Sequence, residues 1–112
     1  MATKRRTDLL QGTLELLVLK TLSLESMHGW GISERIQEWS EDVFLVNQGS
    51  LYPALQRMKR RGWVSSEWRI TPANRRARYY ELTKEGEAQL LEEREYWRRS
   101  AGAVERILRL ST

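Results

Sequence analysis

The sequence has no cysteine, and only one histidine and two prolines among its 112 residues. Without cysteine it cannot form a disulfide framework, a thiolate zinc site or a thiol nucleophile. It also lacks a Walker loop, a dinucleotide fingerprint and a nucleophile elbow, and His28 has no evident catalytic partner. These absences favour a protein that is not an enzyme and that needs no metal or cofactor.

Long apolar runs are missing as well. Even the stretch from Leu14 to Leu22 is interrupted by Lys20, so no segment reaches membrane-spanning length. The start of the chain, Met1 to Arg6, is basic and lacks the apolar segment of a secretory signal. We therefore expect a cytoplasmic protein with no membrane partner.

Charge is present in quantity and is unevenly distributed. The formal net charge is +4 and the isoelectric point is about 9.8. Between Arg57 and Arg78 the only acid is Glu67, whereas between Ser23 and Leu45 the only base is Arg35. A basic block beside an acidic one creates a directed field, which favours an oriented approach to a polyanion such as DNA.

Hydrophobic spacing predicts three helices in the first half of the chain. A capping-box pattern at Asp8 opens a helix that continues to Leu22, and a second helix follows from about residue 28 to residue 40. The third covers residues 48–61. Asn47 and Ser50 are both suitable N-caps for it, and Pro53 predicts a late start or a kinked first turn.

The second half changes period. Residues 64–70 alternate as in a strand, Thr71 to Asn74 have turn chemistry, and residues 77–82 form a second strand. Thr83 then caps a long last helix. This order predicts a mainly α fold with a β-hairpin wing at residues 71–76: a winged helix-turn-helix domain at 1–83, with a basic arm at 1–7, and a C-terminal dimerisation helix at 84–112.

Six short motifs, specific as an ordered set, run through the chain: Leu14 to Leu19, His28 to Trp30, Gly49 to Leu55, Gly62 to Val64, Arg75 to Tyr80 and Leu82 to Gly86. This set resembles the PadR family of bacterial transcriptional regulators, in particular its short subgroup with one C-terminal helix. The resemblance implies a homodimeric winged-helix protein, usually a repressor. It also implies that operator DNA is bound through the Tyr52 helix and the Arg75–Arg76 wing.

The candidate DNA-binding residues lie on the third helix and on the wing: Gln48, Ser50, Tyr52, Gln56, Arg57, Arg60, Arg75, Arg76 and Arg78. Glutamine suits adenine and arginine suits guanine in the major groove, while a helix N-terminus favours a phosphate. Wing arginines suit the minor groove or phosphates. Each candidate has a structural alternative. These are capping for Gln48 and Ser50, half-buried packing for Tyr52, a solvated helix face for Gln56, Arg57 and Arg60, and a charged hairpin tip that aids solubility for the wing arginines.

The last helix carries an apolar seam with coiled-coil spacing, interrupted by Arg94: Leu90, Trp97, Ala101, Val104 and Leu108. We expect this seam to form the interface of a homodimer. In some PadR relatives the dimer encloses an apolar cavity for flat hydrophobic ligands, and by that resemblance Trp97 would line a pocket for a planar hydrophobic effector. Plain interface packing is the alternative role for Trp97.

The sequence thus predicts a DNA-binding transcriptional regulator, most simply a repressor that binds a palindromic operator on double-stranded DNA as a homodimer. Two alternatives remain open. One is a winged-helix module that binds another protein, and the other is a sensor of hydrophobic small molecules whose DNA contacts are secondary.

Overall fold

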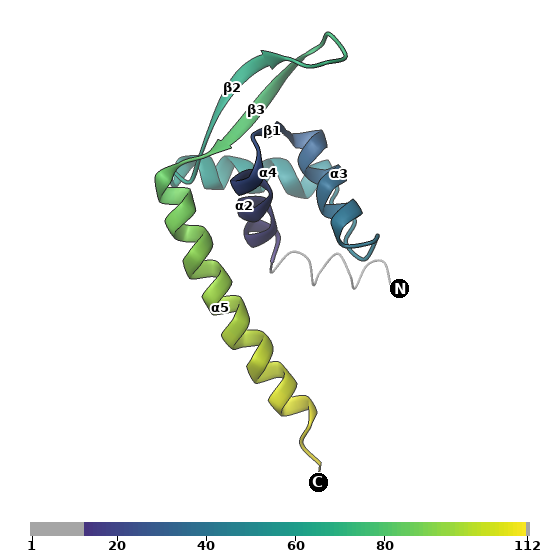
Figure 1. Cartoon of the computed structure of the whole chain (residues 1–112), viewed down its shortest axis with the longest axis vertical. Coiled ribbons are helices and arrows are strands. Elements are labelled where there is room, and N and C mark those ends of the chain that lie inside the picture. The colour runs from purple at the N-terminus through teal and green to yellow at the C-terminus, as the bar shows by residue number, and fades with distance from the viewer. Residues whose placement is uncertain (1–12, 112) are drawn as a thin grey trace.

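The computed structural model describes residues 13–111 (Figure 1). Its elements are, in chain order, α2 (Leu14–Leu24), β1 (Met27–His28), α3 (Gly29–Trp39), α4 (Gln48–Arg60), β2 (Val64–Ile70), β3 (Arg76–Leu82) and α5 (Lys84–Leu108). The predicted winged helix-turn-helix fold with a long C-terminal helix is confirmed. The predicted helix start at Asp8 and the basic arm at 1–7 lie outside the described residues.

Three antiparallel strands form a small sheet in the order β1-β3-β2. Strand β1 was not predicted, because residue 28 was expected to open a helix. Instead Met27 and His28 pair with Tyr80 and Tyr79 of β3, and the helix begins at Gly29. His28 is the N-cap of α3, since its Nδ1 accepts a hydrogen bond from the Gly31 N–H at 3.1 Å.

The core lies between the helices and the base of the sheet. It consists of the side chains that are buried from solvent: Leu14, Val18, Leu19, Leu22, Met27, Ile32, Ile36, Leu51, Ala54, Leu55, Met58, Val64 and Tyr80. Each of α2, α3 and α4 contributes one apolar stripe to this cluster, so the three helices are held in fixed positions by mutual burial. Within residues 13–111, no helix combines the length and the apolarity needed to cross a bilayer.

Helix α4 starts earlier than Pro53 suggested. Asn47 is the N-cap, and its Oδ1 accepts a hydrogen bond from the Ser50 N–H at 2.8 Å. Pro53 therefore lies inside the helix, where it removes one backbone hydrogen bond. The cap predicted at Asn47 is confirmed. Of the two outcomes that Pro53 predicted, the late start is wrong, because the cap and the burial of Leu51 and Leu55 on either side of the proline fix the helix there.

Several hydrogen bonds fix the junction between the base of the hairpin and α5. Thr83 is the predicted N-cap, and its Oγ1 accepts a hydrogen bond from the Gly86 N–H at 3.0 Å. The same hydroxyl lies 2.6 Å from the Gly62 carbonyl oxygen, and the Thr83 N–H donates to the Trp63 carbonyl at 3.0 Å. From this corner α5 leaves the body in the direction opposite to the hairpin (Figure 1).

Candidate nucleic-acid interface

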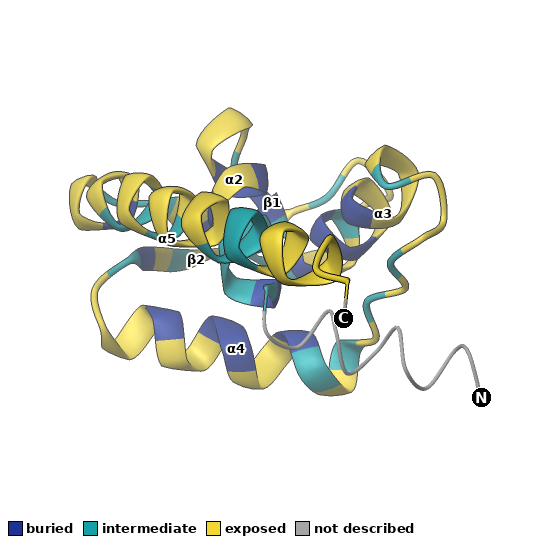
Figure 2. Ribbon diagram, turned by 90° about the horizontal axis from the view of Figure 1, so that it is seen from below, coloured by how far each residue is buried: buried dark blue, intermediate teal, exposed yellow. Residues whose placement is uncertain are grey.

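Helix α4 has a buried stripe and an exposed outer line. With 100° of rotation per residue, the line opposite the buried Leu51, Leu55 and Met58 is formed by Gly49, Pro53, Gln56 and Arg60. All four are exposed, and Figure 2 shows buried and exposed residues alternating along this helix. The first half of the line carries no long side chain, whereas Gln56 and Arg60 extend from the second half.

Tyr52 occupies the flank of α4 that faces α3. Its side chain is 46% exposed, and a Cβ atom at Gly29 would lie 3.4 Å from its hydroxyl, so the glycine permits this close approach. Burial raises the pKa of Tyr80, the neighbouring Tyr52 raises it further, and Arg78 lowers it. Tyr52 therefore lies between the exposed side of α4, the start of α3 and the base of β3.

The N-terminal candidates of α4 are partly engaged within the protein. Gln48 Nε2 donates a hydrogen bond to Ser33 Oγ at 2.7 Å, which links α4 to α3. Ser50 is half-buried, and its N–H is the group that Asn47 caps. Asn47 therefore provides the side-chain cap, and Gln48 orients the helix pair.

Arg57 lies on the opposite flank, beside α2. Its Nε is 3.2 Å from Glu15 Oε2, and Arg61 Nη1 is 3.3 Å from Glu15 Oε1. Because the two arginine side chains are 43% and 50% exposed, the ion pairs contribute little to stability, but they draw Arg57 away from the outer line of α4. This pairing spans 42 residues of sequence, and no local pattern signals it.

The two faces of the hairpin differ in charge. The register places Ser66, Trp68, Ile70, Arg76 and Arg78 on one side, which we call the wing face. Glu67 and Glu81, the acids of β2 and β3, both lie on the opposite side. There Glu67 pairs with Arg69 at 2.8 Å. The wing face therefore carries uncompensated positive charge.

The wing face continues the buried side of the sheet outward. Val64 and Tyr80 belong to the same side and are buried against the helices, so the wing face projects beyond the body on the side of the helices. At the tip, Asn74 adopts a positive φ of 62°, which asparagine tolerates, and Arg75 is exposed in the turn. All three predicted wing arginines thus lie at or near the free end of the hairpin.

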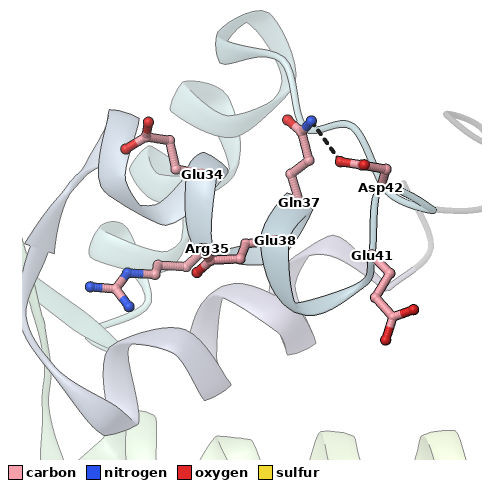
Figure 3. A pocket seen from close by; sticks show the side chains of 6 residues that line it. All are labelled: Glu34, Arg35, Gln37, Glu38, Glu41 and Asp42. Carbon is pink, nitrogen blue, oxygen red and sulfur yellow. Dashed lines mark hydrogen bonds between the residues drawn. The ribbon is translucent and has the colours of Figure 1, made fainter.

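The acidic block lies elsewhere, at the C-terminal end of α3 and in the following loop. Six side chains line a shallow hollow there: Glu34, Arg35, Gln37, Glu38, Glu41 and Asp42. Figure 3 shows that Gln37 donates to Asp42, at 3.0 Å, while Glu34 and Glu41 point away from each other. The carboxylates do not converge on one point, and this end of the molecule repels a polyanion.

The comparisons with known proteins agree with this geometry. The family described as "Transcriptional regulator PadR-like family" matches residues 18–92. The chain belongs to this family. A PadR-like transcriptional regulator from Bacillus cereus is 26% identical, with a TM-score of 0.78 over 94% of this chain and 100% of that one. A PadR family regulator from Eggerthella lenta is 27% identical, with a TM-score of 0.80 over 93% and 88%. An uncharacterised protein of Lysinibacillus sphaericus is 24% identical over 82% of this chain and 84% of its own length.

In this PadR-like regulator the predicted seam of α5 divides into two parts. Leu90 is half-buried and packs against the core of its own chain. Trp97, Val104 and Leu108 are 50%, 55% and 71% exposed. A hollow of about 330 Å³ separates this part of α5 from α2. It is lined by Thr13, Leu16, Glu93, Tyr96, Trp97, Ser100, Ala101 and Val104.

Proposed function

We propose that this PadR-like regulator is a repressor that binds a roughly palindromic operator as a homodimer. Two neighbouring surfaces support the proposal. The exposed line of α4 carries Gln56 and Arg60, and the wing face carries arginines while the acids of the hairpin lie on its other side. A helix buried on one side and polar on the other is what reading in the major groove requires.

The two halves of α4 have different tasks in this proposal. Gly49 and Pro53 let the backbone approach the groove closely, and Gln56 and Arg60 reach the base edges, where they suit adenine and guanine. Tyr52 and Ser50 contact the phosphate backbone beside them, while Gln48 and Arg57 act mainly by holding α4 against α3 and α2. Arg75, Arg76 and Arg78 hold the flanking duplex, at phosphates or in the minor groove.

The dimer forms through α5. Residues up to 83 constitute the DNA-binding part and residues 84–112 the dimerisation helix, whose Trp97, Ala101, Val104 and Leu108 are buried between two copies. A two-fold axis then presents two α4 helices to successive major grooves, about 34 Å apart. Occupation of the operator blocks access to the promoter, which is the basis of repression.

Base reading is tested with the double variant Gln56→Ala/Arg60→Ala on DNA from upstream of the protein's own gene. We expect the wild-type protein to protect a two-fold symmetric footprint, and the variant to lose about a hundredfold in affinity for that site, because each base contact contributes ~1–3 kcal/mol. Its affinity for random DNA should change much less. Glu34→Ala, at the acidic end, is the control. Equal losses on both DNAs would contradict base reading, and no binding by the wild type would favour a protein-interaction module instead.

The hollow between α2 and α5 favours effector sensing as a second function. Its lining by Trp97, Ala101 and Val104 beside Leu16 suits a planar hydrophobic molecule. Such compounds should quench tryptophan fluorescence in the wild type, and Trp97→Leu should remove the concentration-dependent part of the signal. Quenching that persists in this variant would place the ligand elsewhere.

A further inference from the structure

Trp68 is an exposed aromatic residue near the free end of the wing. It belongs to β2, its exposed fraction is 54%, and it is not part of the core cluster. Its position in the hairpin register places it directly opposite Arg78 and diagonally opposite Arg76, which pairs with Ile70. Burial therefore does not explain why a tryptophan stands at this position, whereas contact with its two arginine neighbours does.

Both guanidinium groups lie against this one indole ring. The Cζ atoms of Arg76 and Arg78 are 4.8 Å and 5.0 Å from the ring centroid, within the range of a cation–π contact. Arg78 is held further by Ser66, whose Oγ is 3.2 Å from Nη1. Stacking uses the flat face of a guanidinium and leaves its N–H groups, which lie in the plane, available for phosphate oxygens.

In the described part of the chain, two of the three other arginines that lie over an aromatic ring are paired with acids, and the third, Arg35, belongs to the acidic block. Arg69 stacks on Tyr79 at 5.1 Å and is bonded to Glu67, and Arg61 stacks on Trp63 at 5.0 Å and is bonded to Glu15. Within residues 13–111, neither Arg76 nor Arg78 forms an ion pair. The Trp68 group is therefore an ordered pair of cations without an internal counter-charge.

We propose that Trp68 is a positioning residue for DNA binding, which holds Arg76 and Arg78 on the wing face before the duplex arrives. An arginine side chain that is already ordered loses less conformational freedom when it meets a phosphate, so the same contact yields more affinity. The inference rests on the proposed function, because it requires that the wing contacts DNA. It adds a residue that acts through its neighbours and carries no charge itself.

The first test compares three full-length variants by fluorescence anisotropy on the footprinted duplex. Trp68→Leu should weaken binding about fivefold to tenfold, since it removes two stacking contacts at an exposed site. Trp68→Tyr, which keeps a stacking surface, should recover most of that loss. The control is Trp39→Leu, because Trp39 is 48% exposed and also lies under an arginine, Arg35, but belongs to α3. Its affinity should equal that of the wild type.

The second test places Trp68→Leu in the Arg76→Ala/Arg78→Ala background. The double arginine variant should bind more weakly and reduce the salt slope by about one unit per lost phosphate contact. In that background Trp68→Leu should have no further effect. A further loss would overturn the inference, because Trp68 would then contact DNA itself.

The two proposals fail in different ways. If the arginine variant loses affinity while Trp68→Leu and Trp68→Tyr both bind like the wild type, the positioning role is wrong and DNA binding by the wing stands. If the wild-type protein binds no duplex at low salt, both proposals are wrong. Should Trp68→Leu fail to fold, as judged by circular dichroism, Trp68→Thr takes its place in both backgrounds, because threonine suits a strand and has no ring: an equal affinity loss in both would overturn the inference.

Discussion

Replacing Gly86 by alanine is expected to lower the free energy of unfolding by about 2–4 kcal/mol, measured by urea denaturation. Gly86 lies in the first turn of α5 and is buried. An added Cβ would overlap the Trp63 carbonyl oxygen and would lie 2.6 Å from Leu82 Cδ1. The carbonyl cannot move aside, because it also accepts the hydrogen bond from the Thr83 N–H at 3.0 Å.

Gly102 provides a matched control on the same helix. A Cβ at Gly102 would meet nothing closer than Arg106 Nη1 at 4.0 Å, so Gly102→Ala should stabilise the protein by about 0.5–1 kcal/mol through helix propensity alone. The two substitutions are chemically identical, but they should change the free energy of unfolding in opposite directions. Stabilisation by Gly86→Ala would show that Gly86 does not pack against the Trp63 carbonyl as described.

Replacing Trp97 by aspartate is expected to convert the proposed dimer into a monomer and to weaken operator binding by a factor of roughly 10²–10⁴, the avidity contributed by a second binding unit. Trp97 is 50% exposed in the single chain, so the variant should still fold. The introduced carboxylate would be buried without a partner in a dimer paired through α5, which is strongly unfavourable. Sedimentation velocity and anisotropy on the footprinted duplex measure the two effects.

Ala88→Asp is the control for the added charge. Ala88 is exposed and lies on the side of α5 away from the seam, so this variant should remain dimeric and should bind the operator nearly as well as the wild type. If Trp97→Asp also sediments as a dimer, the interface lies elsewhere than on the Trp97 side of α5.

Periodicity and capping patterns predicted most of the fold. The helix at residues 48–61, the alternation of 64–70 and the cap at Thr83 all depend on residues close together in sequence, and the structure reproduces them with small shifts at the ends. Strand β1 was not predicted because two residues are too few to show a period, and because its pairing partner in β3 is some 50 residues away. The late helix start predicted from Pro53 was wrong for a related reason, because the burial of Leu51 and Leu55 outweighs the hydrogen bond that the proline removes.

The candidate site was predicted less completely. Sequence spacing places Gln56 and Arg60 on the exposed side of α4, but it does not show that Glu15 pairs with Arg57 or that Ser33 binds Gln48, because those partners come from other helices. The contacts of Trp68 with two arginines were not predicted, although the alternation around it was read as a strand. The registered pairing of β2 with β3 was needed to show which arginines flank its ring.

The bonded corner at Thr83 and Gly86 also determines where the far end of α5 lies. Helix α5 is uninterrupted for 25 residues, about 37 Å, so each degree of tilt at its base moves its far end by about 0.6 Å. In the proposed dimer, which is paired along α5, a change in this tilt changes the spacing between the two α4 helices. In the proposed dimer, the length of operator that fits therefore depends on the Thr83 hydroxyl, Gly86 and the Trp63 carbonyl oxygen.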